Sequence, residues 1–143
     1  MISLKKVTFL YKFVHIPKDE KKLFFEAVLF LFFSKTLLFL PFRYCIKRLR
    51  PSNQMIGIAN PLELKKIHLA VYRANRLAFW KNICLVQSFA ARLMLQRRNI
   101  GSVLYLGLQF RNDTELVAHA WLVSNEIQIT LKGRTQYKEI FSI

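Results

Sequence analysis

The feature that constrains the fold most is an apolar run from Leu23 to Leu40, which lies between two prolines, Pro17 and Pro41. Proline is favoured in the first turn of a helix and ends a helix that reaches it, so we predict a helix from about Lys18 to about Leu40. A surface helix normally shows one apolar stripe, whereas this segment is apolar on every side. It must therefore be covered by protein or by lipid.

The composition of this run leaves both coverings open. Its length just reaches the lower end of what spans a bilayer. Glu26 and Lys35 oppose insertion by up to about 2.5–3.5 kcal/mol each, and about a dozen Leu, Phe and Val offset this at roughly 0.3–0.6 kcal/mol each. We favour a helix that is buried or covered by a partner. A helix that spans the membrane is the alternative, and residues 23–42 are also a candidate for contact with a membrane surface.

Length and charge indicate one domain with an uneven surface. A chain of 143 residues with 53% hydrophobic residues can bury a core as a single domain, 1–143. Most of the net charge of +15 lies in the first half of the chain. We therefore expect residues 1–80 to form a basic, hydrophobic helical region that docks a partner or a peptide, and residues 81–143 to hold the catalytic elements.

Several classes of function are disfavoured. Basic residues can bind phosphates, but the aromatic residues are mostly Phe inside apolar runs and form no stacking platform, so we expect no nucleic-acid partner. The two cysteines, Cys45 and Cys84, are too few for a disulfide scaffold, and no close Cys/His set suggests a metal. No cofactor is expected.

The N-terminus lacks the pattern of a secretory signal, so we expect a cytoplasmic protein, with membrane association as the alternative.

The remaining patterns predict an α+β fold in which N-terminal helices pack on a small antiparallel sheet. A short helix is expected at 42–49, and a further helix, capped by Asn60, from Pro61 to about 79. Asn82 can cap a further helix that has Cys84 in its first turn. Apolar runs then predict strands at 103–108, which should be buried on both faces, 116–123 and 127–131, and the C-terminal tail can add one more.

Cys84 and His119 are the groups that a thiol acyl-transfer enzyme needs. A helix N-terminus favours the thiolate and offers N–H groups to an oxyanion, and an imidazole can act as the base. For Cys84 the alternative is a small buried side chain, which is what we expect of Cys45. His119 lies between two alanines, which leave space for a substrate, but it could also be a histidine of the core.

The positions of other residues in the predicted elements indicate further roles in the site. Trp121 shares the face of His119 and could form a wall of the substrate site or belong to the core. Gln87, one turn after Cys84, is a candidate oxyanion donor or a solvent-facing residue. A two-residue turn at 125–126 would place Thr130 opposite Trp121, so Thr130, Gln128 or a backbone carbonyl is expected to orient the imidazole unless the enzyme works as a dyad.

An ordered set of motifs resembles a known family. Cys-Leu opens a helix that ends in LMLQRR, Asn-Ile-Gly-Ser leads into a hydrophobic strand, and Ala-His-Ala-Trp precedes a hairpin. Over about residues 80–143 this order resembles the lasso-peptide leader peptidases, a transglutaminase-like group of cysteine proteases. The long Leu/Phe helix followed by Pro41, Phe42 and Arg43 is also similar.

The resemblance implies a papain- or transglutaminase-type core and a thiol protease that removes the leader from a ribosomally made precursor peptide. Cys84 would be the nucleophile and His119 the general base. Family members commonly have an Asp about a dozen residues after the histidine, where this chain has Thr130 and Leu131.

The resemblance also implies partners. A leader-recognition domain delivers the leader, and because no such segment precedes the predicted helix at Lys18, we expect a stand-alone protease that needs this protein in trans. An ATP-dependent lasso cyclase would take up the product. The competing hypothesis is a membrane-associated basic binding protein in which Cys84 and His119 are structural.

Overall fold

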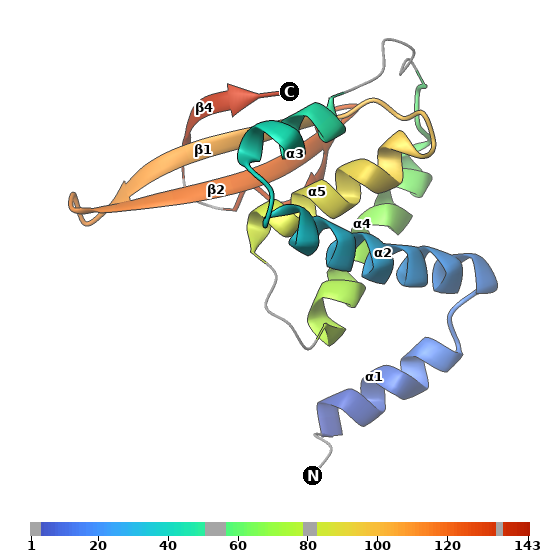
Figure 1. The fold of residues 1–143 in the computed structure, drawn as a ribbon. Helices are drawn as coiled ribbons and strands as arrows, with labels where there is room; N and C mark the ends of the chain where they lie inside the picture. Colours follow the sequence, from blue (N-terminus) through green and yellow to red (C-terminus); the bar gives the residue numbers. More distant parts are fainter. Residues whose placement is uncertain (1–3, 51–56, 79–82, 134–135) are drawn as a thin grey trace.

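A computed structural model describes residues 4–50, 57–78, 83–133 and 136–143, and shows the predicted α+β fold. Within these residues the chain forms five helices and one four-stranded sheet (Figure 1). The elements are α1 Leu4–Val14, α2 Lys18–Leu37, α3 Phe42–Leu49, α4 Pro61–Leu77, α5 Cys84–Gln96, β1 Val103–Arg111, β2 Glu115–Ser124, β3 Ile127–Thr130 and β4 Lys138–Ser142.

The sheet is antiparallel, with strand order β3-β2-β1-β4. β1 and β2 form a long hairpin that extends beyond the helices (Figure 1). The turn between β2 and β3 has Asn125 at φ 47° and Glu126 at φ 65°. Two successive positive φ values are typical of a type I′ turn, whose twist matches that of the strands. The predicted two-residue turn and the additional strand in the C-terminal tail are both confirmed.

The burial of β1 differs from the prediction that this strand is covered on both faces. Of its residues only Leu104 and Gly107 are buried. The helices α4 and α5 make their main sheet contacts with β2 and β3, so β1 is flanked by strands and receives little cover from helices. An apolar run therefore did not distinguish a central strand from one that is covered on both faces.

The register of β3 also differs from the prediction, because a bulge lies next to Leu122. A regular hairpin would pair Trp121 with Thr130, but the register shifts between Leu122 and Val123, and Thr130 pairs with Leu122 instead. A shift of one residue moves a side chain to the other face of a sheet. Thr130 therefore points toward the helices together with Leu122, and the prediction that it faces Trp121 is wrong.

Helix α2 is amphipathic in its packing although its composition is apolar all round. One face, which includes Phe24 and Leu31, is buried against α4 and α5. Phe25, Leu29 and Phe32 lie on another face and are 58%, 70% and 59% exposed. The helix ends at Leu37, earlier than predicted. In the described part of the chain, no helix combines the length and apolarity that crossing a membrane requires.

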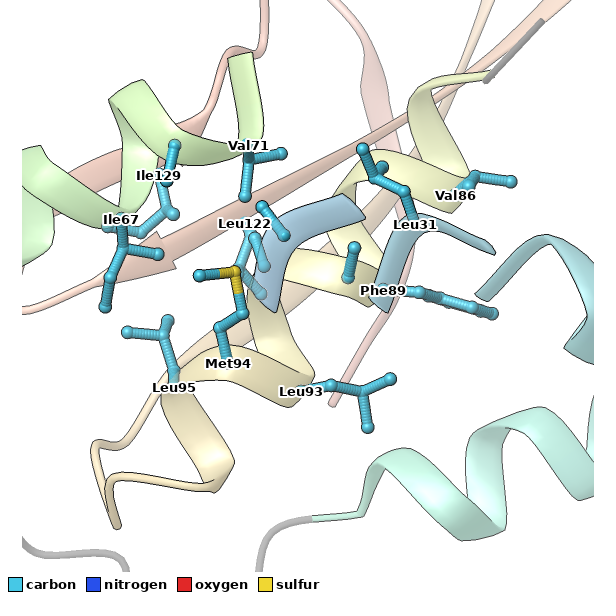
Figure 2. Close-up of a cluster of buried hydrophobic side chains, with 14 of the residues drawn as sticks. Leu31, Ile67, Val71, Val86, Phe89, Leu93, Met94, Leu95, Leu122 and Ile129 are labelled. Atoms are coloured by element: carbon cyan, nitrogen blue, oxygen red, sulfur yellow. The ribbon is translucent and has the colours of Figure 1, made fainter. Parts of the chain in front are cut away.

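The core is centred on α5, which contacts α2, α3, α4, β2 and β3. Its residues from Val86 to Leu95 are buried apart from Gln87. Figure 2 shows Phe89 and Met94 of this helix within a cluster that also includes Leu31 of α2 and Leu122 of β2. One continuous core therefore includes both the N-terminal helices and the sheet.

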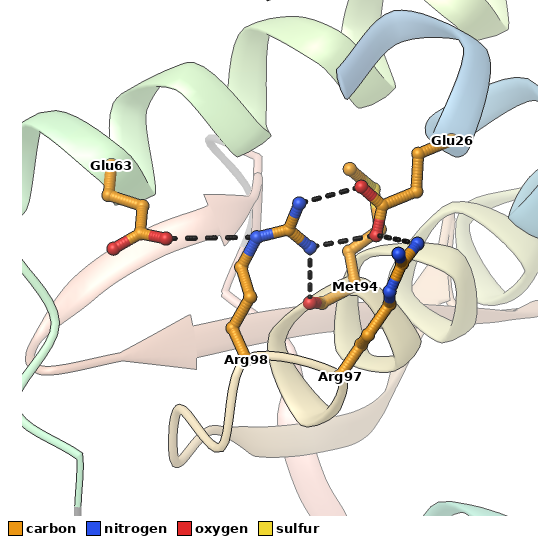
Figure 3. A network of polar contacts seen from close by, with 5 residues as sticks. All are labelled: Glu26, Glu63, Met94, Arg97 and Arg98. Atoms are coloured by element: carbon orange, nitrogen blue, oxygen red, sulfur yellow. Dashed lines mark hydrogen bonds and ion pairs between the residues drawn. The ribbon is translucent and has the colours of Figure 1, made fainter. Parts of the chain in front are cut away.

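A guanidinium–carboxylate pair connects α2 to the end of α5 (Figure 3). Arg98 Nη1 and Nη2 donate to the two carboxylate oxygens of Glu26 at 2.7 and 2.6 Å, and Nη1 also donates to the Met94 carbonyl. Glu63 of α4 lies 3.7 Å from Arg98 Nε. The hydrogen bond to Glu26 raises the pKa of Arg98. Glu26, which opposes membrane insertion, thus forms a paired contact within the protein.

We predict that Glu26→Gln destabilises the fold, because it leaves Arg98 without its bidentate charged partner in a partly buried site. The expected loss in the free energy of unfolding is about 1.5–3 kcal/mol, as for hydrogen bonds to charged groups. Urea unfolding followed by circular dichroism measures it. Glu115→Gln is the matched control, because its 3.9 Å ion pair with Arg111 is exposed and should contribute little. Equal losses in the two variants would contradict the prediction.

Candidate active site

Cys84 is the first residue of α5 and is half-buried. Its N-cap residue, Ile83, has no side-chain oxygen to accept from the first amides, and the first bond in this turn runs from Gln87 N to the Ile83 carbonyl. Amides at the start of a helix lack acceptors within the helix and favour negative charge nearby. The predicted cap, Asn82, lies outside the described residues. The start of α5 therefore favours a thiolate at Cys84 and also an oxyanion that forms beside it.

The second cysteine has a different environment. Cys45 lies in α3, is 1% exposed and donates its thiol hydrogen to the Leu37 carbonyl at 3.1 Å. Burial raises its pKa. A buried thiol with a raised pKa is a poor nucleophile. Cys45 is therefore the small buried side chain that its sequence context predicts.

Cys84 and His119 line the same cavity, which has a volume of about 220 Å³. Gln87 lines it too, and His68 and Asn75 of α4 lie on its wall. Among the residues that the structure describes, no hydrogen bond joins the sulfur to the imidazole. Such bonds are often long before substrate binds, so the shared cavity is the relevant observation. A thiol, an imidazole and helix-start amides thus meet in one space.

The His119 ring is held by a main-chain carbonyl. Its Nε2 lies 2.8 Å from the carbonyl oxygen of Leu131. A carbonyl can only accept, so Nε2 carries the hydrogen and Nδ1 is the nitrogen that can take a proton. β3 ends at Thr130, and its pairing with β2 covers only the end of β2, beyond His119. A backbone carbonyl was one of the predicted orienting groups, and it occupies the position along the chain where the resembled family has an Asp.

An aromatic cluster surrounds the ring on its other side. His119 stacks on Tyr137 with the ring centres 4.9 Å apart and lies 6.1 Å from Trp121. Trp121 is 2% exposed and is absent from the cavity wall. Gly107 pairs with His119, and a Cβ there would lie 2.9 Å from the indole. Only glycine lets the indole approach the strand this closely. Trp121 thus supports the ring from outside the cavity.

The Thr130 hydroxyl is engaged elsewhere. Its Oγ1 accepts from the backbone N–H of Leu122 at 2.9 Å and lies 2.7 Å from the Ser88 hydroxyl. Both Ser88 and Thr130 are buried. The bulge is the reason, since it turns Thr130 toward the helices, whereas the His119 ring nitrogen bonds to Leu131.

His68 is a cavity residue that the sequence did not indicate, since a histidine among lysines is usually a surface residue. It is half-buried, and its Nδ1 donates to the Ile129 carbonyl at 2.8 Å. A signal was present: His68, Tyr72 and Asn75 are spaced as one stripe of a helix, beside the buried Val71. Among the described residues, no cluster of three or more His, Cys, Asp or Glu could hold a metal ion.

The family model described as the transglutaminase-like superfamily matches residues 28–142. The chain belongs to this superfamily. Members of the transglutaminase-like superfamily are typically enzymes of the cysteine-protease type, which agrees with a cysteine at a helix start and a histidine on a strand in one cavity. Neither a curated protein nor a solved structure matches the chain significantly.

The hydrogen bonds predict opposite tautomers for the histidines of this transglutaminase-like protein. His119 should carry its hydrogen on Nε2, whereas His15 and His68, whose Nδ1 atoms face the carbonyls of Tyr11 and Ile129, should carry it on Nδ1. Nitrogen-15 NMR of the ring atoms at a pH where the imidazoles are neutral distinguishes the two forms. The other two histidines are the internal reference. An Nδ1–H form of His119 would contradict the carbonyl contact.

Proposed function

We propose that this protein is a cysteine peptidase that removes the leader from a ribosomally synthesised lasso precursor peptide, in the cytoplasm and with a separate leader-recognition protein. The observation that supports this best is the cavity shared by Cys84 and His119. The family match supports thiol chemistry of the peptidase type. The choice of a lasso precursor follows from the ordered motifs around Cys84 and His119.

In the proposed reaction, His119 Nδ1 accepts the thiol proton and Cys84 Sγ attacks the carbonyl carbon of the last leader residue. The carbonyl oxygen becomes an oxyanion at the start of α5, where backbone N–H groups stabilise it. The C–N bond then breaks, and the imidazolium protonates the departing amine, which is the new N-terminus of the core peptide. Water, deprotonated by His119, hydrolyses the thioester and releases the leader as a carboxylate. The freed amine is then available to an ATP-dependent cyclase.

We predict that cleavage depends on Cys84 and not on Cys45. Cys84→Ala should abolish cleavage, because no other thiol lines the cavity, and His119→Ala should lower kcat by about 10²–10⁴-fold, the usual contribution of a general base. The assay combines the chain with a lasso precursor peptide and a leader-recognition protein, and mass spectrometry detects leader and core. Cys45→Ala is the control and should retain activity. Cleavage that persists in Cys84→Ala would refute the proposal.

We further infer that the exposed face of α2 docks the recognition protein. Phe25, Leu29 and Phe32 form an apolar stripe at helical spacing. Lys18, Lys21 and Lys22 lie on the first turns of the same helix, which also hold Asp19 and Glu20. An apolar stripe bordered by basic residues suits a partner with an apolar patch and an acidic rim. The same composition would suit an anionic membrane surface, which is the second candidate.

Leu29→Glu tests both possibilities, because a charge buried at the contact weakens either one, and two assays then separate them. We expect it to slow cleavage at limiting recognition protein while leaving cleavage at saturating recognition protein unchanged. Leu116→Glu is the matched control, since this leucine is also exposed but lies on the β1–β2 hairpin. Sedimentation with phosphatidylserine-containing vesicles tests the second candidate. Vesicle binding that Leu29→Glu removes, with unchanged dependence on the recognition protein, would favour the membrane.

A further inference from the structure

Ser88 is a polar residue in the most buried helix of the protein. It lies one turn after Cys84 on α5, and residues four apart share a face of a helix. The side chain is 0% exposed, among apolar neighbours such as Phe89. A buried hydroxyl has a cost unless it is hydrogen-bonded, so its partners indicate why it is tolerated there.

The partners of Ser88 form a chain of hydrogen bonds across three elements. Leu122 N–H donates to Thr130 Oγ1 at 2.9 Å, and Ser88 Oγ lies 2.7 Å from Thr130 Oγ1 and 3.3 Å from the Ala120 carbonyl. The carbonyl can only accept, so the Ser88 hydrogen points to Ala120 and the Thr130 hydroxyl donates to Ser88. Each of the two hydroxyls in this chain of hydrogen bonds then donates once and accepts once.

This hydrogen-bond chain reaches both backbone segments that place His119. Ala120 follows His119 in β2, and Leu131, whose carbonyl accepts from His119 Nε2, follows Thr130. Ser88 is one turn from Cys84. The two hydroxyls therefore connect the helix that bears the thiol to the backbone that holds the imidazole and to the backbone that orients it.

We propose that Ser88 and Thr130 form a positioning pair that sets the separation and orientation of Cys84 and His119. This inference rests on the proposed peptidase function. Ser88 is absent from the cavity wall, and Thr130 lies on it, but the Thr130 hydroxyl is bonded to Ser88 and to the Leu122 N–H. Each hydroxyl therefore acts through the backbone, and Ser88→Ala tests this without changing the cavity wall. Apolar contacts of Val86, Phe89 and Leu93 hold α5 in the core without the pair. Loss of the pair should thus alter the geometry of the site more than the stability of the fold, and a misplacement of about 1 Å can lower a rate about 100-fold.

The test compares Thr130→Val, which keeps the shape and removes the hydroxyl, with Thr130→Ser, which keeps the hydroxyl. We expect kcat for leader cleavage to fall about 10–100-fold in Thr130→Val with little change in KM, and most of this loss to be restored in Thr130→Ser. Ser88→Ala should behave like Thr130→Val, and the double variant should show no further loss, because either change breaks the same chain.

Ser124→Ala is the control for loss of a buried hydroxyl. Ser124 is 2% exposed, lies in the same strand as His119 and donates to the Gly101 carbonyl at 2.6 Å, but it is absent from the cavity wall. It should lower the Tm to a similar extent while leaving kcat unchanged. Equal kcat losses in Ser124→Ala and Thr130→Val would mean that loss of the pair lowers kcat only by destabilising the fold. This result would overturn the inference.

The two proposals fail in different ways. If the unaltered chain shows no cleavage that depends on Cys84, the peptidase proposal is overturned, and the catalytic role of the pair with it. If the unaltered chain cleaves and Thr130→Val retains its kcat, only the positioning pair is overturned. The rate of alkylation of Cys84 by iodoacetamide in a Cys45→Ala background gives a second readout, and we expect it to change in Thr130→Val but not in Ser124→Ala.

Discussion

Enclosure of α5 is the constraint on which the rest of the structure depends. The helix includes a buried arginine, Arg92, which is 1% exposed and donates to the carbonyls of Leu49, Ser102 and Ile143 at 2.7, 3.1 and 2.7 Å. Burial lowers the pKa of Arg92 to about 10, so the group remains charged at neutral pH. A buried charge is tolerated only when its donors are satisfied. The end of α3, the approach to β1 and the end of β4 must therefore converge on this helix, whose first residue is Cys84.

Much of the fold follows from local signals in the sequence. Asn60 accepts from Leu62 N and Pro61 begins α4, as their residue types predict. The turn at 125–126 also formed as expected. The bulge beside Leu122 did not, because it depends on a tertiary contact: the Leu122 N–H bonds to the Thr130 hydroxyl. Spacing along the chain cannot indicate such a replacement of a ladder hydrogen bond by a side chain.

The residues of the site also divide into those that the sequence indicated and those that it did not. Cys84 and His119 were identifiable because their chemistry is rare in an apolar setting, and the structure brings both to one cavity. Ser88 and His68 were missed because their roles are set by partners far away in the sequence, at Thr130 and Ile129. The sequence predicted that α2 is covered, but the face that is buried could not be predicted, for a related reason. When a helix is apolar all round, only its neighbours decide which face is buried.

The orienting group at His119 has a chemical consequence. A carbonyl and a carboxylate both fix the tautomer, but hydrogen bonds to a charged acceptor are roughly twice as strong, and a carboxylate also offsets the charge of an imidazolium. In this chain the acceptor is the neutral carbonyl of Leu131. In the proposed peptidase, a thiolate–imidazolium pair would therefore gain less stabilisation through the imidazole and would need more from the start of α5. This places a stricter demand on the position of Cys84 relative to His119, which is the geometry that the buried hydroxyls of Ser88 and Thr130 are arranged to hold.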